Sequence, residues 1–334
     1  MRLIDLHCNW AIQYARESTQ YNPVLYCEIP GKLDQVDGYL SAVSAAVLVC
    51  GRRTEDWSAQ RDPWRQLGEM IARYEAEFCG RMLHGPDDVA RWLAEPESDA
   101  ICWGMLGIEG LDFLVRESTD LDRISVLLDR GVRVFQLAAS ASSPLAGVSA
   151  AGDDRGLTEL GRSLLEILAD LAPPPVEPRP RPVVDLAGLN ARSTGDVLSW
   201  FEADSPRCER VPLVRSRGGV DDSGFLHNNL ARLRALGGVI GLSVGPPLVA
   251  STESLREGIE AIAAVPFQGR PGYEGIGIGS RYLELERSAA QLASAAEVTE
   301  WLTATYPPAI ALALVQGNAR KLLLRAAGAP SIPL

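Results

Sequence analysis

Short apolar segments alternate with amphipathic segments along the whole chain. The apolar segments are continuous, without regular polar positions, which is typical of strands buried on both faces of a parallel sheet. Apolar residues in the intervals between them follow helical spacing. We therefore predict eight strands, at residues 3–6, 45–50, 100–108, 132–137, 182–186, 211–214, 238–242 and 275–279.

Helix start and stop signals agree with this alternation. Pro63 stands where a helix begins, and Gly131 stands just past the end of another. The helices that we predict cover residues 33–41, 63–74, 86–93, 121–129, 156–171, 195–202, 224–236 and 252–263, with further helical segments from Ala289 onward.

Eight strands that alternate with helices indicate an α/β fold, and in particular a (β/α)8 TIM barrel. A doubly wound open sheet is the alternative. The glycines of the strand at 275–279 are not a dinucleotide-binding fingerprint, because no βαβ unit and no acidic partner follow them.

One proline-rich segment, at 173–182, interrupts the pattern. It is short and lies between a helix and a strand, so we interpret it as a stiff loop. Residues 1–334 then form a single barrel domain with a helical C-terminal segment at 289–327. A linker between two domains is the other interpretation of such a segment.

Composition narrows the possible partners. With a net charge of −11 and a pI near 4.9, the chain lacks the basic surface of a nucleic-acid-binding protein. No apolar run approaches the roughly 18 residues of a membrane span. The first strand begins too close to Met1 for a signal peptide, and the six cysteines show no C-x-x-C spacing. We therefore expect a cytoplasmic protein with reduced thiols.

Polar residues at strand ends are the candidates for chemistry. His7 and Asn9 follow the first strand, and Glu109 follows the third. In a barrel of this kind, the residues just past the C-terminal ends of the strands build the active site. These side chains are therefore expected at the mouth of the barrel.

With the strand ends in order, the chain resembles the membrane (renal) dipeptidase family, which are zinc-dependent barrels of the amidohydrolase type. The resemblance is spread over most of the chain and implies a metal-dependent-hydrolase barrel, with dipeptide hydrolysis as the ancestral activity. The segments that carry it are 4–7, 107–110, 131–137, 156–161, 185–186, 237–240, 277–280 and 317–320.

The same resemblance implies two zinc ions on six ligand positions, and most of these are changed. His7 and Glu109 match. The positions of two aspartates and two histidines are occupied by Asn9, Gly188, Arg217 and Arg281. A further histidine after strand four is Ala139, and the Arg-Asn pair that resembling enzymes use for the substrate carboxylate is Asn228-Asn229, preceded by His227.

The charges of the substituted residues argue against zinc binding. Two carboxylates that would balance zinc are absent, and two arginines stand among the ligand positions. A zinc ion ~5 Å from one guanidinium is repelled by roughly 6–7 kcal/mol at an effective dielectric of ~20. Zinc also normally has at least three protein ligands, and His7 and Glu109 supply two. We expect no metal, with these two residues as the remnant of a ligand set.

The sequence thus predicts a dipeptidase-like protein that has lost hydrolysis and binds a small peptide- or carboxylate-containing molecule at the barrel mouth. The alternative is a dipeptidase or small-amide hydrolase with an atypical site that has one zinc or none. The ligand-binding candidates are His7, Asn9, Glu109, Arg217, Arg281, His227 and Asn228.

Two roles stay open for the charged candidates. Glu109 is either a buried carboxylate paired with Arg217 or Arg281, or a residual catalytic acid or base. The two arginines either form that ion pair or bind a carboxylate or phosphate of a ligand. His7 is either hydrogen-bonded in the barrel mouth or a residual metal ligand. The resemblance also makes a homodimer plausible.

Overall fold

Eight parallel strands close into a barrel in the order β1-β2-β3-β4-β5-β6-β7-β8. The computed structural model describes residues 1–9, 38–51, 62–96, 101–149, 152–204, 206–219, 227–246, 248–281 and 292–330. The α/β barrel predicted from the alternation is confirmed. The strands are β1 (Leu3–Cys8), β2 (Val43–Gly51), β3 (Trp103–Glu109), β4 (Val132–Gln136), β5 (Val183–Asp185), β6 (Leu213–Arg215), β7 (Val239–Leu242) and β8 (Ile276–Ile278).

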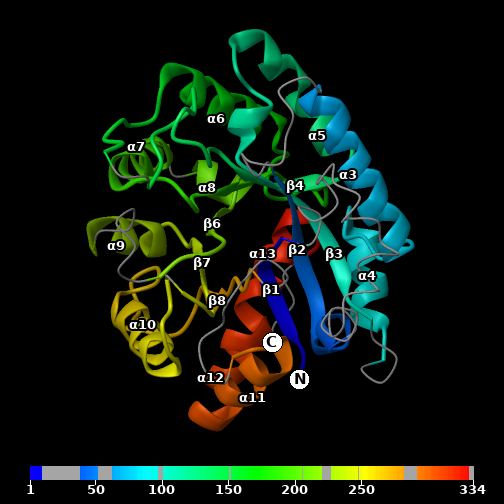
Figure 1. Cartoon of the computed structure of the whole chain (residues 1–334), viewed down its shortest axis with the longest axis vertical. Helices are drawn as coiled ribbons and strands as arrows, with labels where there is room; N and C mark the ends of the chain where they lie inside the picture. The colour runs from blue at the N-terminus through cyan, green and yellow to red at the C-terminus, as the bar shows by residue number, and fades with distance from the viewer. Residues whose placement is uncertain are drawn as a thin grey trace.

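Helices surround the strands (Figure 1). Their bounds are α3 (Pro63–Phe78), α4 (Pro86–Ala94), α5 (Ile124–Asp129), α6 (Glu159–Leu171), α7 (Ala191–Glu202), α8 (Pro206–Arg210), α9 (His227–Ala235), α10 (Thr252–Ala264), α11 (Ala295–Thr305), α12 (Pro308–Leu312) and α13 (Asn318–Ala326). Three short helical turns complete them, η3 (Leu111–Phe113), η4 (Ser118–Arg123) and η5 (Ala313–Gly317). In the described residues, no helix is both long and apolar enough to cross a lipid bilayer.

The strands are apolar on both sides because each side faces a separate core. On β2, Ala46, Leu48 and Cys50 belong to the larger core cluster, to which helices α3, α6, α7 and α10 also contribute. Val47 and Val49 alternate with them and belong to a second cluster, which includes Leu322 and Leu323 of α13. Burial on both faces explains the continuous apolar runs of the sequence.

Local signals set several element ends where they were expected. The Asp62 side chain accepts a hydrogen bond from the Trp64 amide and caps α3, while Thr158 does the same for Gly161 at the start of α6. Gly131 adopts the left-handed conformation (φ 88°) just past α5. The proline-rich segment 173–182 connects α6 to β5 within the barrel.

Other predicted bounds were wrong. The helix expected at 195–202 begins at Ala191, because the Asn190 side chain accepts from the Ser193 amide and caps it there. The helix expected at 121–129 begins as the η4 turn, and the short α8 was not predicted. Residues 33–37, 224–226 and 289–291 of other predicted helices lie outside the described residues.

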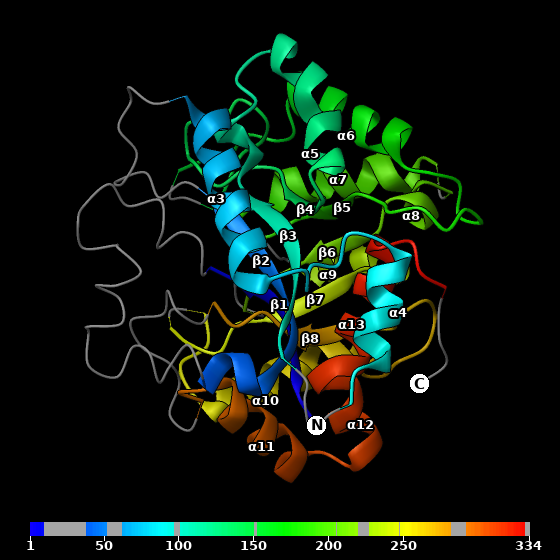
Figure 2. The ribbon, with the colours of Figure 1, turned by 90° about the vertical axis from the view of Figure 1, so that its right-hand side faces the viewer.

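The loop after β6 crosses the ends of the two strands that follow it. A Cβ atom at Gly241 on β7, or at Gly279 after β8, would overlap the carbonyl oxygen of Ser216. The absence of side chains at these two positions lets the β6 loop lie over the barrel. This path brings Arg217 toward the opposite side of the mouth. Figure 2 shows the strands in the interior of the molecule, with helices on the outside.

This close approach can be tested with one added methyl group. Gly279→Ala is expected to lower the free energy of unfolding by about 1–3 kcal/mol, because the backbone carbonyl of Ser216 cannot rotate away from the new atom. Gly68→Ala is the control, because this α3 position has no atom within 4 Å of its Cβ direction. The control should raise the free energy of unfolding by about 0.5–1 kcal/mol. Urea unfolding measures both, and equal effects would contradict the packing.

Candidate functional site

Glu109 ends β3 and is the centre of a polar network at the barrel mouth. Its Oε1 accepts a hydrogen bond from Arg217 Nη2 at 2.5 Å, and its Oε2 accepts one from Asn9 Nδ2 at 3.0 Å. The side chains of Glu109 and Arg217 are only 12% and 17% exposed. Both oxygens of this carboxylate are therefore bound by donors, from the ends of β1 and β6. A buried carboxylate needs such donors and a counter-charge.

His7 lies beside this ion pair and is fully buried. Its Nδ1 is 2.8 Å from the Ser216 hydroxyl, which lies 2.5 Å from Asp185 Oδ2. Burial, followed by the charges of Arg217 and Arg281, holds the pKa of His7 well below its ordinary value, against a smaller opposing effect of Asn9. The ring is therefore neutral. Its Nε2 faces Glu109, at 3.9 Å from Oε1.

The same aspartate–serine arrangement occurs twice under the mouth. Asp5 on β1 accepts from the backbone amide and the hydroxyl of Ser280, which follows β8. Asp185 on β5 accepts likewise from Ser216, which follows β6. In each case Oδ1 also accepts from the amide two residues further along, which for Asp5 is that of His7. Burial raises the pKa of both carboxyl groups.

Arg281 follows β8 in the left-handed conformation, at a φ of 57°. Its backbone amide donates to the His7 carbonyl at 2.9 Å, which joins the ends of β8 and β1. Its charge contributes to the lowered pKa of His7. The structure thus brings together five of the predicted site residues, namely His7, Asn9, Glu109, Arg217 and Arg281.

The other two candidates, His227 and Asn228, make no contact with this network among the described residues. His227 begins α9, but its side chain lies outside the described residues. Asn228 is exposed in the first turn of the same helix. The neighbouring Asn229 is buried and donates to the Ala191 carbonyl at 2.8 Å, which attaches α9 to α7.

Gly188 stands where the resemblance implies a histidine, and its backbone conformation favours glycine. Its φ is +80°, which favours glycine, and a Cβ atom there would lie 2.9 Å from Gln136 Nε2. Gln136 in turn donates to the Ala138 carbonyl at 3.2 Å. The space beside Gly188 is therefore occupied by an amide from β4.

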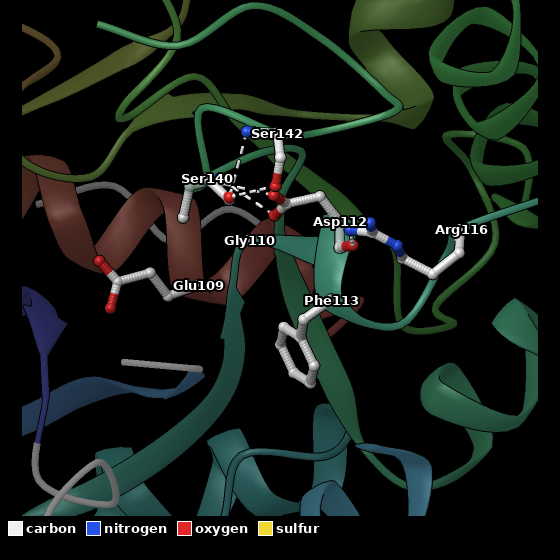
Figure 3. Close-up of a pocket in the computed structure, with 8 residues that line it drawn as sticks. Glu109, Gly110, Asp112, Phe113, Arg116, Ser140 and Ser142 are labelled. Carbon is white, nitrogen blue, oxygen red and sulfur yellow. Dashed lines mark hydrogen bonds between the residues drawn. The ribbon is translucent and has the colours of Figure 1, made fainter. Parts of the chain in front are cut away.

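A cavity of about 160 Å³ lies beside Glu109, over the loops that follow β3 and β4 (Figure 3). Asp112 holds these loops together, because its carboxylate accepts from the amides of Ala139 and Ser140, each at 3.0 Å. Gly110 permits the approach, since a Cβ atom there would lie 2.7 Å from that of Ala139. The cavity lining is Glu109, Gly110, Asp112, Phe113, Arg116, Ala139, Ser140 and Ser142.

The lining offers hydrogen-bond donors at one end. Arg116 Nη1 donates a hydrogen bond to the backbone carbonyl of Asp112 at 3.1 Å. The Arg116 residue is exposed. None of the ion pairs in the described part of the chain involves Arg116. The hydroxyls of Ser140 and Ser142 are 2.9 Å apart, so one of them retains a hydrogen to donate. Figure 3 draws Glu109 and Arg116 at opposite ends of this group.

The residues present do not fit a dinuclear zinc centre. Within the described ranges, no three of the histidine, cysteine, aspartate and glutamate side chains lie close enough together to hold a metal ion. A guanidinium occupies the face of the Glu109 carboxylate that a metal would need, and the amide donor of Asn9 occupies the other oxygen. Zinc sites need at least three protein ligands.

Sequence reasoning missed the residues that support the site. Ser216 belongs to no motif of the sequence, and Asp185 stands out there only as part of a strand, yet together they orient His7. The signal was a charged residue at a buried strand end, Asp5 as much as Asp185. Arg116 and Ser140 lie in loops without a recognisable pattern, so nothing in the sequence pointed to the cavity.

Comparison with known proteins agrees with the fold. No protein-family model and no curated protein sequence matches the chain. Among solved structures, the dipeptidase AC, a metallopeptidase of family M19, is similar with a TM-score of 0.73 and 17% sequence identity, over 98% of this chain and 99% of that one.

Two further structures are similar over the same extent. A metallopeptidase from Rhodobacter sphaeroides, liganded with a phosphinate mimic of the dipeptide L-Ala-D-Ala, has a TM-score of 0.72 and 15% identity, over 98% of this chain and 99% of that one. An amidohydrolase from Pseudomonas aeruginosa has a TM-score of 0.69 and 12% identity, over 98% and 97%. At these identities the likeness shows the fold, which is that of dipeptidases and amidohydrolases.

Removing one partner of the Glu109–Arg217 ion pair should destabilise the folded protein. Arg217→Ala is expected to lower the free energy of unfolding by about 3 kcal/mol, because the carboxylate is left without a counter-charge in a mostly buried site. Arg65→Ala is the control, since the Arg65–Glu69 pair is 80% and 52% exposed and should contribute at most about 0.5 kcal/mol.

The double variant Glu109→Gln/Arg217→Met removes both charges and should recover most of the loss. Urea unfolding of all four proteins measures the differences. If Arg217→Ala costs no more than Arg65→Ala, the ion pair is not a structural element of the mouth.

Proposed function

We propose that this protein is a dipeptidase-like barrel that binds a small carboxylate-bearing molecule at its mouth and does not perform dinuclear zinc hydrolysis. The observation that carries the proposal is the Glu109 carboxylate, with Arg217 Nη2 at 2.5 Å from one oxygen and Asn9 Nδ2 at 3.0 Å from the other. The carboxylate that could bridge two metals is instead neutralised by the protein itself.

The adjoining cavity supports a ligand of modest size. Its volume of about 160 Å³ corresponds to roughly five water molecules at about 30 Å³ each, well below the roughly 300–1,000 Å³ of pockets for drug-sized molecules. Arg116 and the Ser140–Ser142 hydroxyl pair offer the donors that a carboxylate accepts.

The metal content of the purified protein is the first test. We expect zinc far below two ions per chain after purification with added zinc and dialysis, because the ligand set is incomplete and Arg217 and Arg281 repel a divalent ion. Inductively coupled plasma mass spectrometry gives the stoichiometry. Two zinc ions retained per chain would refute the proposal.

Carboxylate binding is the second test. Propionate at millimolar concentration is expected to raise the melting temperature, since a ligand that binds only the folded state stabilises it by mass action. Arg116→Gln should abolish most of the rise, whereas Arg65→Gln, an exposed arginine on α3, should leave it unchanged. A panel of acetate, propionate, benzoate and phosphate without any stabilisation would contradict carboxylate binding.

An atypical hydrolase is the second candidate, favoured by the proximity of His7 Nε2 and Glu109 Oε1 at 3.9 Å. Such a pair could hold one metal or act on a water molecule. The test is the cleavage of L-Ala-D-Ala and other dipeptides with added zinc, cobalt or manganese. Turnover that is lost in Glu109→Gln but retained in Glu69→Gln would favour this candidate over the binding protein.

A further inference from the structure

The loop segment 139–143, which follows β4, carries two of the hydroxyl groups that line the cavity. These belong to Ser140 and Ser142 (Figure 3). Ala139, Ala141 and Ser142 are exposed, so apolar packing does little to hold the segment. An exposed loop of this kind depends on its hydrogen bonds to keep one conformation. These bonds therefore decide where the two hydroxyl groups lie.

One guanidinium group holds the C-terminal part of this segment. Arg155 donates through Nη2 to the Ala141 carbonyl at 2.6 Å and through Nη1 to the Ser143 carbonyl at 2.8 Å. Ser142 stands between these two residues, so its backbone is held on both sides. The N-terminal part of the segment is held in the opposite way, by amides that donate to the Asp112 carboxylate.

An ion pair orients Arg155 itself. Its Nε lies 2.9 Å from Asp153 Oδ1 and its Nη2 lies 2.9 Å from Asp153 Oδ2, and two such bonds fix the plane of the guanidinium group. The Asp153 side chain is 8% exposed and also accepts from the Val148 amide at 3.0 Å. The bond from Arg155, followed by that from Val148, holds the pKa of Asp153 well below its ordinary value. The carboxylate is therefore ionised at neutral pH.

The backbone of the same pair is attached to helix α7. The Asn190 side chain, which caps α7, donates to the carbonyls of Asp153 and Arg155, each at 2.8 Å. The Ser193 hydroxyl also donates to the Arg155 carbonyl, at 3.2 Å. Arg155 thus connects a helix to the loop beside the cavity, and groups that are supported by such elements are placed more precisely than groups on loops alone.

Arg155 acts on the cavity through this segment and not by direct contact. Among the described residues, the cavity lining contains Ser140, Ser142 and Arg116 but not Arg155. The charge of Arg155 is balanced by Asp153. A ligand in the cavity therefore meets the two hydroxyl groups that Arg155 holds, and not the guanidinium group itself.

We propose that Arg155 is a positioning residue of the candidate site, which holds the Ser140–Ser142 hydroxyl pair where it donates to the carboxylate of the ligand. This inference rests on the proposed function. The segment 139–143 is then ordered before the ligand binds, so that its ordering does not reduce the binding free energy. Loss of the Arg155 side chain should weaken binding although every group that contacts the ligand is retained.

The affinity for propionate tests this role. We expect Arg155→Met to bind propionate about fivefold to twentyfold more weakly, which corresponds to the loss of about one hydrogen bond to the carboxylate. Arg162→Met is the matched control, because the side chains of Arg155 and Arg162 are 43% and 44% exposed and each is paired with an acidic residue. Calorimetric titration gives the dissociation constants. The control should bind propionate as the unaltered protein does.

The variant Arg155→Lys separates positioning from charge. A lysine keeps the positive charge beside Asp153, but one ammonium group cannot replace a planar fork that reaches two carbonyls and a carboxylate. We therefore expect Arg155→Lys to bind propionate nearly as weakly as Arg155→Met. An affinity equal to that of the unaltered protein would show that charge alone is required, and would overturn the positioning role.

Hydrogen exchange locates the effect without any ligand. Within the segment, the Ser143 amide donates to the Ser140 carbonyl at 2.9 Å. In Arg155→Met we expect faster amide exchange in peptides that cover residues 139–149 and unchanged exchange in α3 and α11. Unchanged exchange in the segment would contradict the proposal, and so would an equal acceleration along the whole chain, because the effect would then not be local.

The outcomes separate this inference from the proposed function. Weaker binding by both Arg155 variants, with local loss of protection, supports the positioning role. Binding of propionate that is unaffected in both variants would refute this role and leave carboxylate binding intact. Failure of the unaltered protein to bind any carboxylate would refute the proposed function and the positioning role together.

Discussion

The carboxylate of Glu109 requires a counter-charge, and the way in which it is supplied shapes the barrel mouth. A carboxylate that is 12% exposed has lost most of its hydration, so positive charge and donors must come from the protein. They come from Arg217 after β6 and Asn9 after β1, strands that are not neighbours of β3 in the barrel. The ion pair therefore joins elements that backbone hydrogen bonds between neighbouring strands do not join.

The fold could be predicted from the sequence because its signals are local and repeated. Continuous apolar runs such as the one in β2 report burial on both faces, and caps such as Asp62 and Thr158 mark where helices begin. Glu109 and His7 could be assigned to the mouth because strand ends of a closed barrel meet at one edge. The expectation that Arg217 and Arg281 oppose zinc binding rests on their charge alone.

The rest depends on contacts between distant residues that no local pattern encodes. Sequence reasoning left Arg217 and Arg281 as equal partners for Glu109, and the choice of Arg217 depends on the path of the β6 loop over Gly241 and Gly279. The orientation of His7 depends on Ser216, which is 209 positions away along the chain. The cavity beside Arg116 depends on how Asp112 holds two loops together.

The conformation of Gly188 limits which residues can stand at this position of the barrel mouth. A histidine at this position would adopt a left-handed backbone at a cost of order 1–3 kcal/mol and would collide with the Gln136 amide. A single substitution cannot place a side chain there without strain, because the backbone and Gln136 would have to change at the same time. Residue 188 and residue 136 therefore form one unit of variation, in which a side chain at the first position requires a change at the second.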